Sequence, residues 1–396
     1  MAADVKLSQR MEHVSYPIRD VVLAARKVQA KGMPMHWFNI GDPNRFDFAP
    51  PPWVTEAAKA ALDQPQYSGY APSEGDPDLR EAIAKNEGIS ADSIFVTYGL
   101  SEGLSFLFDA LLDPGDNILL PSPSYPLYST ISRVLGGQDN YYRTDAQFQP
   151  DIDDLRKKIN SRTRAITLIS PNNPTGAVYS HSTVQSILDL AGEHGLPVIA
   201  DEIYDQLCFD GPYTPVYKLA TDVPVIRGNG MSKNFFYPGA RVGYLALHGP
   251  GLEPLQGALT RLCNARLSVN WEMQRAALAA FTRAPTHLPA ALSKLRPRRD
   301  LIVRRLNAIE GIRAVQPQAA FYIFPQLTAG PWKTDFEFVY DLLEHTGIVG
   351  VPGSGFSTDL PGRFFRLVYL AKEPEINSAM DKLEAFMKKR LAGRAD

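Results

Sequence analysis

The strongest constraint on the fold is an alternation along the middle of the chain. Short runs of apolar and β-branched residues predict strands at 93–98, 117–120, 164–170, 197–200, 224–228 and 241–247. Between them, apolar residues at helical spacing predict helices over 101–112, 125–135 and 183–194. Strands separated by helices form βαβ units, in which the strands run parallel. We therefore expect an α/β fold with a mostly parallel central sheet and helices on both faces.

The pattern changes after about residue 285. A long helical stretch runs from there to residue 309, shorter strands are predicted at 319–324 and 364–370, and a charged helix at 375–391. This order of elements predicts a second, smaller α+β domain. A helix-like stretch at 20–31 can pack on either domain, and its own pattern does not decide between them.

Composition excludes several classes of protein. The 396 residues include 41 Lys+Arg and 43 Asp+Glu, a balance that disfavours nucleic acid or an anionic membrane surface as the main partner. The apolar runs are shorter than the ~18 residues that span a bilayer. Two cysteines, Cys208 and Cys263, make no disulfide framework, and the N-terminus has no signal-peptide core, so we expect a cytoplasmic protein. The histidines and cysteines show no metal-ligand spacing, so no metal is expected.

Four polar segments follow predicted strands or lie between them. They are Gly99-Leu-Ser-Glu-Gly103, Ser170-Pro-Asn-Asn-Pro-Thr-Gly176, Ala200-Asp-Glu-Ile-Tyr204 and the stretch 230–244, which contains Lys233. Each has an ordinary interpretation on its own: a helix start, an Asn-Pro turn, a helix-capping carboxylate and a solvated lysine. Ligands of open α/β sheets bind outside the carboxyl ends of the strands, so the four together predict one binding site.

The order of these motifs resembles that of the class I pyridoxal-phosphate (PLP) aminotransferases of fold type I, from about residue 16 to 371. The resemblance rests on Asn-Asn-Pro-Thr-Gly at 172–176, Asp-Glu-Ile-Tyr at 201–204, and Ser-Lys at 232–233 followed by Gly-Ala-Arg-Val-Gly at 239–243. Segments 16–19, 39–43, 229–233 and 265–270 are similar to the alanine (glutamate–pyruvate) branch. Within this frame we assign residues 46–284 to a large PLP-binding domain, and 1–45 with 285–396 to the small domain.

The resemblance implies pyridoxal 5′-phosphate as cofactor and a role for each matching residue. Lys233 resembles the lysine that binds the cofactor aldehyde and moves the substrate proton, and Asp201 the carboxylate that pairs with the pyridine nitrogen. Tyr204 and Asn173 resemble the donors to the phenolic oxygen, and Tyr125 the aromatic residue stacked on the ring. The residues implied around the phosphate are Gly99, Leu100, Ser101, Ser232 and Arg241, with Tyr70 reaching it from a neighbouring subunit in a homodimer.

Substrate contacts are implied in the same way. Arg366 resembles the arginine that holds the α-carboxylate, with Asn173 beside it and the Gly41 backbone closing over it. Tyr16 and Arg19 resemble mobile residues at the entrance of the site. Arg266 is a weaker candidate for a distal carboxylate, and a structural role fits it equally well.

Two further positions carry expectations. Many relatives have a serine three residues before the lysine, and this chain has Gly230 there, a departure that the alanine branch shares. The basic cluster Arg296-Pro-Arg-Arg299 on the long predicted helix is expected to be a solvated face.

The activity that the resemblance implies is transfer of an amino group between an L-amino acid, alanine or glutamate, and a 2-oxo acid, pyruvate or 2-oxoglutarate, by a ping-pong mechanism. Aspartate or aromatic substrates stay open, as does other PLP chemistry on the same fold, such as a carbon–sulfur β-lyase or a cyclopropane-forming synthase. A regulator with an aminotransferase-like sensor domain is disfavoured, because the roughly 40 residues before the first motif are too few for a winged helix.

Overall fold

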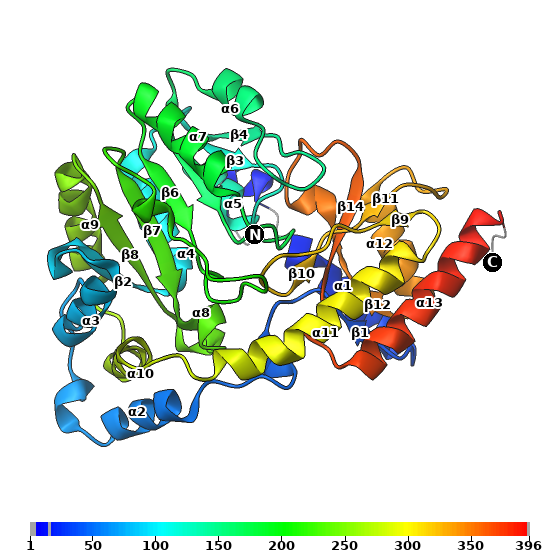
Figure 1. The fold of residues 1–396 in the computed structure, drawn as a ribbon, viewed down its shortest axis with the longest axis horizontal. Helices are drawn as coiled ribbons and strands as arrows, with labels where there is room; N and C mark the ends of the chain where they lie inside the picture. Colours follow the sequence, from blue (N-terminus) through cyan, green and yellow to red (C-terminus); the bar gives the residue numbers. More distant parts are fainter. Residues whose placement is uncertain (1–4, 15–16, 394–396) are drawn as a thin grey trace.

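A seven-stranded sheet organises the larger part of the molecule (Figure 1). The computed structural model describes residues 5–14 and 17–393. In spatial order the strands are β2 Ile94–Tyr98, β8 Val242–His248, β7 Val225–Gly230, β6 Val198–Asp201, β5 Thr163–Ile169, β3 Asn117–Pro121 and β4 Gln138–Tyr142. Strand β8 runs antiparallel to both of its neighbours, and the other neighbouring pairs are parallel. The predicted α/β class with a mostly parallel sheet is confirmed.

Helices cover both faces of this sheet because its strands are apolar on both sides. In β3, Ile118 and Leu120 join one core and Leu119 joins another. The first core is shared with α4 Gly99–Leu111, α5 Leu127–Val134 and α9 Glu253–Arg266, and the second with α6 Ile152–Lys158 and α7 His181–Glu193. A third core, over the edge strand β2 and its neighbour β8, is closed by α2 Pro52–Leu62, α3 Pro77–Glu87 and α10 Trp271–Thr282.

The C-terminal part forms a separate, smaller arrangement around β14 Arg363–Val368. Strands β10 Tyr322–Ile323, β11 Gln326–Leu327 and β13 Val351–Pro352 pair with β14, and β9 Ile312–Arg313 pairs with β11. The helices of this part are α11 Leu288–Asn307, α12 Asp335–Thr346 and α13 Glu373–Leu391. Short 3-10 helices also occur, at Gln9–His13, Pro43–Arg45, Pro65–Ser68, Ala91–Ser93, Val216–Lys218, Pro238–Ala240 and Gly353–Gly355.

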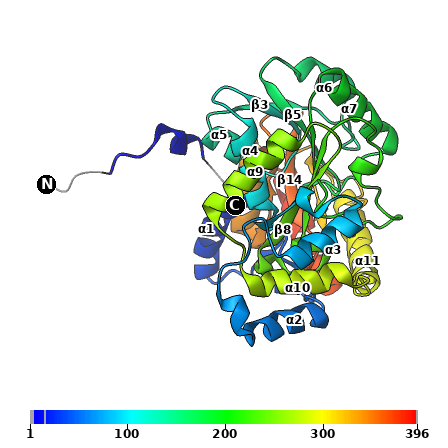
Figure 2. The ribbon, with the colours of Figure 1, turned by 90° about the vertical axis from the view of Figure 1, so that its left-hand side faces the viewer.

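The N-terminal segment joins this C-terminal part through β1. Strand β1 His36–Trp37 pairs with β12 Ile348–Val349 in parallel, and the preceding helix, α1 Pro17–Ala30, lies against α12 (Figure 1). Residues 5–8, before the first 3-10 helix, extend away from the body, as Figure 2 shows. The domain limits at 45/46 and 284/285 stay a prediction, and the β1–β12 pairing supports the placement of the N-terminal segment with the C-terminal part.

Several predicted elements differ from the observed ones. Strand β4 was not predicted, because its sequence, Gln-Asp-Asn-Tyr-Tyr, lacks the apolar run of a buried strand and it lies at the sheet edge. The helix predicted over 125–135 begins at Leu127, after Pro126. The strand predicted at 319–324 is reduced to Tyr322–Ile323.

The expectation that the basic cluster on α11 is solvated was wrong for two of its arginines. Arg298 and Arg299 are each 3% exposed, and Arg298 makes a bidentate ion pair with Asp47, at 2.8 Å for both bonds. The physical reason is that one side of α11 packs on the core and against α13 and β9, so charges on that side must be paired. Arg296, with a side chain 46% exposed, fits the expectation.

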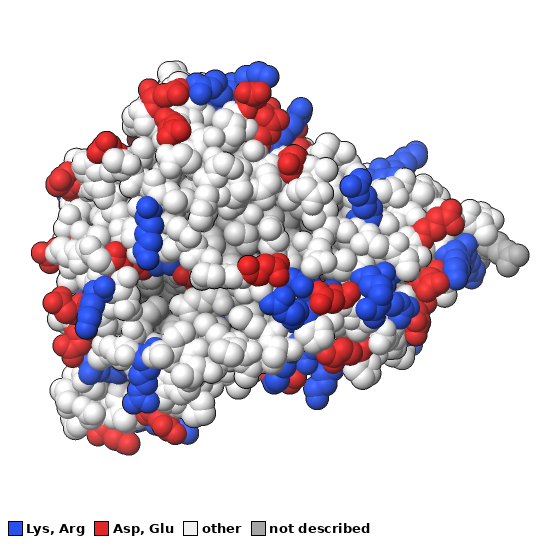
Figure 3. Space-filling model, in the orientation of Figure 1, with Lys and Arg blue, Asp and Glu red and all other residues white. Residues whose placement is uncertain are grey.

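On the face drawn in Figure 3, Lys and Arg side chains alternate with Asp and Glu rather than forming a field of one sign. Among the residues that the structure describes, no helix combines the length and the apolar character needed to cross a bilayer. The same residues hold no group of three or more His, Cys, Asp or Glu arranged to bind a metal ion.

Candidate active site

The polar motifs meet at one edge of the central sheet. Strands β5 and β6 end there, next to Asn173 and at Asp201, and β7 ends before α8 Met231–Asn234, which carries Lys233. Strand β2 also ends at this edge, and the antiparallel β8 begins there, after Arg241. The sheet topology thus gathers side chains that are far apart in the sequence at the carboxyl edge of its parallel strands.

These side chains line one cavity of about 520 Å³. The predicted residues on its wall are Arg19, Gly41, Leu100, Ser101, Tyr125, Asn173, Asp201, Tyr204, Ser232, Lys233, Arg241 and Arg366. A cavity of this size, with a few convergent polar groups on an otherwise mixed wall, is typical of a small-molecule site.

Four predicted residues are not among the described residues on that wall. Tyr16 lies outside the described part of the chain. Gly99 is the first residue of α4 and directly precedes Leu100, which is on the wall. Tyr70 is 82% exposed to solvent. Arg266 forms an ion pair with Glu102 at 2.6 Å and donates to the Ser73 carbonyl at 2.8 Å, contacts that fit its structural interpretation.

Lys233 is the basic group in the centre of the cavity. Its Nζ donates to the Gly41 carbonyl at 2.8 Å. Burial lowers the pKa of the lysine from 10.5 to about 8; the Asp42 charge opposes this shift, and the Arg366 and Arg241 charges add to it. Near neutral pH the amine can therefore change its protonation state at low cost, as a group that transfers protons must.

Asp201 faces the cavity from the end of β6 and is 5% exposed. Its Oδ2 accepts a bond from the Tyr128 hydroxyl at 2.8 Å, and its Oδ1 accepts one from the Ile203 amide at 3.2 Å. Burial raises the pKa of this carboxyl to about 6, and the two hydrogen bonds limit the rise. A buried carboxylate held by only two neutral donors is well suited to a cationic ligand atom.

The two consecutive asparagines after β5 have different tasks. The Asn172 side chain closes its own turn, accepting from the Thr175 amide at 3.2 Å and the Thr175 hydroxyl at 2.9 Å. The Asn173 side chain instead faces the cavity, and its Oδ1 accepts from Arg366 at 3.0 Å. The turn thus fixes Asn173 beside the arginine.

Arg366 is 1% exposed, and its guanidinium contacts several neighbouring groups. It lies on β14, in the C-terminal part of the chain, and also donates to the Asn39 carbonyl. Its guanidinium lies 4.8 Å from the ring centres of both Tyr322 and Phe356. Aromatic faces on a planar cation leave its edge as the binding surface, which is the geometry that recognises a carboxylate.

The structure adds two tyrosines that the sequence analysis missed. Tyr128, in the first turn of α5, binds Asp201, and the Tyr322 hydroxyl lies 2.9 Å from that of Tyr204. The available signal for Tyr128 was its i, i+3 spacing from Tyr125 within the helix predicted over 125–135. Tyr322 carried none, because its partner is 118 residues away in the sequence.

At the far end of the cavity, α4 points its N-terminus inward beside Arg241. Arg241 donates to the carbonyls of Pro238 at 2.9 Å and Tyr98 at 3.2 Å, and its own φ is +52°. Gly99, with φ +69°, lets the guanidinium lie against the first turn, where a Cβ atom would strike it. Helix α4 has 13 residues, and the amides of its first turn lie at this end of the cavity. Together with Ser101, Ser232 and Arg241 on the wall, they suit an anion such as phosphate.

The glycine in place of a serine before the lysine has a steric explanation. A Cβ atom on Gly230 would lie 2.6 Å from the Val242 carbonyl oxygen and 2.7 Å from Gly243 Cα, both on the adjacent strand β8. A serine therefore requires β8 to move, and the anion end of the site is served by the remaining donors.

Comparison with known proteins identifies the family of this chain. The family model described as aminotransferase class I and II matches residues 34–383. The glutamate–pyruvate aminotransferase AlaA of Haemophilus influenzae is 33% identical, with 96% of this chain and 97% of that protein covered. The alanine aminotransferase of Mycobacterium bovis is 34% identical, with 96% and 92% covered. The solved alanine aminotransferase of Pyrococcus furiosus is 45% identical with a TM-score of 0.95, covering 97% of this chain and 100% of that one. Because the family model matches most of its length and the relatives are more than 30% identical over nearly the whole chain, this chain belongs to the class I and II aminotransferase family.

Proposed function

We propose that this protein is a PLP-dependent aminotransferase that exchanges the amino group between alanine or glutamate and the 2-oxo acids pyruvate or 2-oxoglutarate by a ping-pong mechanism. The observation that carries the proposal is one cavity shared by the Lys233 amine, the Asp201 carboxylate and the Arg366 guanidinium. The names of the relatives support the alanine and glutamate preference.

The residues on the wall fit PLP in the distribution of their charges. Asp201, buried with two neutral donors, suits the protonated pyridine nitrogen, and the α4 N-terminus with Arg241 suits the phosphate. Lys233 and Tyr125 line the same cavity, which supports their assignment to the aldehyde and to the ring face. When bound, PLP supplies an electrophilic carbon for the amino group and a ring that withdraws electrons from the substrate Cα.

The protein's own contribution is to orient the substrate and to move one proton. Arg366, held by Asn173, binds the α-carboxylate through two parallel N–H···O bonds and so fixes Cα relative to Lys233. The Lys233 Nζ, which lines the same cavity, would move the proton between the substrate Cα and the aldehyde carbon of the cofactor. Tyr204, with its hydroxyl 2.9 Å from that of Tyr322, would donate to the phenolic oxygen of the cofactor.

Assembly and location belong to the same proposal. We infer a homodimer with shared active sites, in which the exposed Tyr70 reaches the phosphate end of the partner's cavity. The free cysteines Cys208 and Cys263 support a reducing, cytoplasmic location.

The test follows each half of the reaction separately. PLP-loaded protein mixed with L-alanine or L-glutamate alone should show a shift of the cofactor absorbance and release one equivalent of the matching 2-oxo acid. L-Aspartate, L-tyrosine and L-cysteine are measured in parallel. A faster half-reaction with aspartate or tyrosine would replace the substrate assignment, and steady release of sulfide from cysteine would replace amino transfer with β-elimination.

Lys233→Ala provides the control for the chemistry. It should lower kcat by at least about 10⁴-fold, since it removes a group that acts both as covalent anchor and as acid–base catalyst. The thermal unfolding midpoint and circular dichroism should stay close to those of the unchanged protein. Substantial turnover in this variant would contradict the assignment of Lys233.

A further inference from the structure

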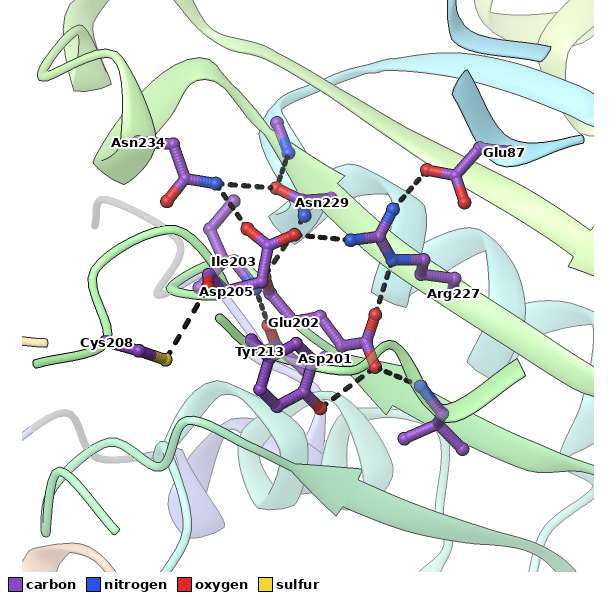
Figure 4. Close-up of polar contacts among 12 residues, drawn as sticks. Glu87, Asp201, Glu202, Ile203, Asp205, Cys208, Tyr213, Arg227, Asn229 and Asn234 are labelled. Carbon is purple, nitrogen blue, oxygen red and sulfur yellow. Dashed lines mark hydrogen bonds and ion pairs between the residues drawn. The ribbon is translucent and has the colours of Figure 1, made fainter. Parts of the chain in front are cut away.

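A buried cluster of charges lies behind the cavity, centred on Arg227 of β7 (Figure 4). Arg227 is 6% exposed and pairs with three carboxylates from different parts of the chain: Glu87, Glu202 and Asp205. Glu87 ends α3, while Glu202 and Asp205 belong to the turn after β6. Because a guanidinium is planar and rigid, pairing with three carboxylates in three directions fixes the positions of those carboxylates relative to one another.

One of these carboxylates, Asp205, connects the cluster to the helix that carries Lys233. Asp205 accepts from Arg227 with Oδ2 and from the Asn234 side-chain amide, at 2.6 Å, with Oδ1 (Figure 4). Asn234 is the last residue of α8 and directly follows Lys233. The contacts therefore run from Arg227 through Asp205 and Asn234 to the one-turn helix that carries the lysine.

Other contacts hold the same helix end. Asn229 bonds the Gly230 amide through its Oδ1, at 2.7 Å, and the Glu202 carbonyl through its Nδ2, at 3.1 Å. The ring Nε2 of His287 lies 2.7 Å from the Asn234 carbonyl. Since α8 has only four residues and no side-chain cap, its position depends on such bonds from outside.

We propose that Asp205 and Asn234, held by Arg227, are positioning residues for Lys233, which fix its amine relative to Asp201 and Tyr204. The end of β6 and the turn after it carry Asp201, Tyr204 and Asp205, so the Asp205–Asn234 bond ties the lysine helix to the segment that supplies its two partners. This inference rests on the proposed function for its kinetic consequence, but its structural part concerns the protein without cofactor.

The first measurement uses cofactor-free protein. Cyanate reacts with neutral amines, so peptide mass spectrometry of carbamoylated Lys233 across pH reports the pKa of that amine. In the unchanged protein the Lys233 amine should titrate with a pKa of about 8. The charged groups that act on it are Asp42, Asp201, Arg241 and Arg366. In Asn234→Ala the helix loses its anchor and the amine gains water, so the pKa should rise toward 10.5.

The second measurement uses PLP-loaded enzyme. Asn234→Ala and Asp205→Asn should each lower kcat about 10- to 100-fold with KM for alanine changed less than about 3-fold, because misplacing a reacting group affects the chemical step more than binding. The double variant Asp205→Asn/Asn234→Asp reverses donor and acceptor at the same net charge. It should recover most of the lost kcat and return the Lys233 pKa toward 8.

Tyr244→Phe is the matched control. Tyr244 donates to Glu87 of the same cluster at 2.6 Å and accepts from Arg227 at 3.3 Å, but it takes no part in the Asp205–Asn234 bond. Its loss should lower the unfolding midpoint while the Lys233 pKa and kcat stay unchanged. The proposal is overturned if Tyr244→Phe shifts the lysine as Asn234→Ala does, or if Asn234→Ala and Asp205→Asn leave the labelling profile unchanged. The labelling result stands even if the enzyme proves to catalyse no amino transfer, so the two proposals can fail separately.

Discussion

At the scale of single residues, Asp201 shows how burial and hydrogen bonding compete at this site. Removing the carboxylate from water raises its pKa to about 6, while the bonds from Tyr128 and Ile203 hold the rise down. Without a cation next to it, the ionised carboxylate costs folding free energy that a bound pyridinium would offset. This cost can be measured directly in cofactor-free protein.

Asp201→Asn should change how the stability of the cofactor-free protein depends on pH. A carboxyl whose pKa is raised by folding stabilises the native state below its unfolded value of 3.8, and this contribution is lost as pH rises through about 6. Between pH 4 and 6.5 the unchanged protein should therefore lose on the order of 2–3 kcal/mol relative to the variant. Urea unfolding at a series of pH values measures this difference. Glu202, whose pKa burial raises to about 7, is present in both proteins and cancels in the comparison. Parallel pH profiles for the two proteins would contradict the assigned shift.

Sequence reasoning found the residues of the site whose chemical type is distinctive within a motif. Lys233, Asp201 and Arg366 each stand in a recognisable segment next to a strand, and the structure places all three on the cavity wall. Tyr128 and Tyr322 act through a hydroxyl bond to a residue on another element, and no local pattern encodes that partner. The sequence also could not explain why residue 230 is glycine, because the atoms that a side chain there would strike belong to the neighbouring strand β8.

At the scale of elements, apolar periodicity predicted the buried strands well and the burial of charges poorly. Strands β3 and β5 contain continuous apolar runs and were found, whereas the polar edge strand β4 was not. In α11, apolar periodicity also failed to show that two of the arginines are buried, so they were predicted to be solvated. Whether an arginine is buried depends on what packs against its helix, and the sequence of the helix does not contain that information.

The two kinds of arginine in α11 should respond differently to removal. Arg298→Ala leaves Asp47 without its bidentate partner and the Leu370 carbonyl without a donor, so it should cost about 2–4 kcal/mol of folding free energy. Arg296→Ala, at a half-exposed position, should cost less than about 1 kcal/mol. Urea denaturation at pH 7 compares them. The loss in Arg298→Ala should shrink as pH falls toward 2, where Asp47, whose pKa the Arg298 bond lowers to about 2, becomes protonated. Equal losses for the two variants would refute the burial argument.

At the scale of the whole molecule, one chain supplies nearly all of the predicted site. The cavity wall takes residues from the N-terminal segment, the central sheet and β14 of the C-terminal part, which is why no continuous segment of the sequence could reveal its shape. Tyr70 is the exception among the described residues assigned to the cofactor: it is 82% exposed in the single chain. An exposed tyrosine assigned to a phosphate site is consistent with a site completed by a second copy.

A mixing experiment tests whether two chains share a site. Tyr70→Ala and Lys233→Ala are expected to be defective separately, the first by about 10-fold through loss of a bond to the charged phosphate. After the two variants are unfolded together and refolded, hybrid dimers contain one site with both defects and one with neither. If Tyr70 acts across the interface, random pairing should restore about a quarter of the unchanged activity, because half of the dimers then hold one intact site of two. Each variant refolded alone controls for recovery, and light scattering establishes the dimer mass. If Tyr70 acts within its own chain, hybrids hold one defect in each site and no activity above the average of the two parents appears, which would place the tyrosine outside the partner's site.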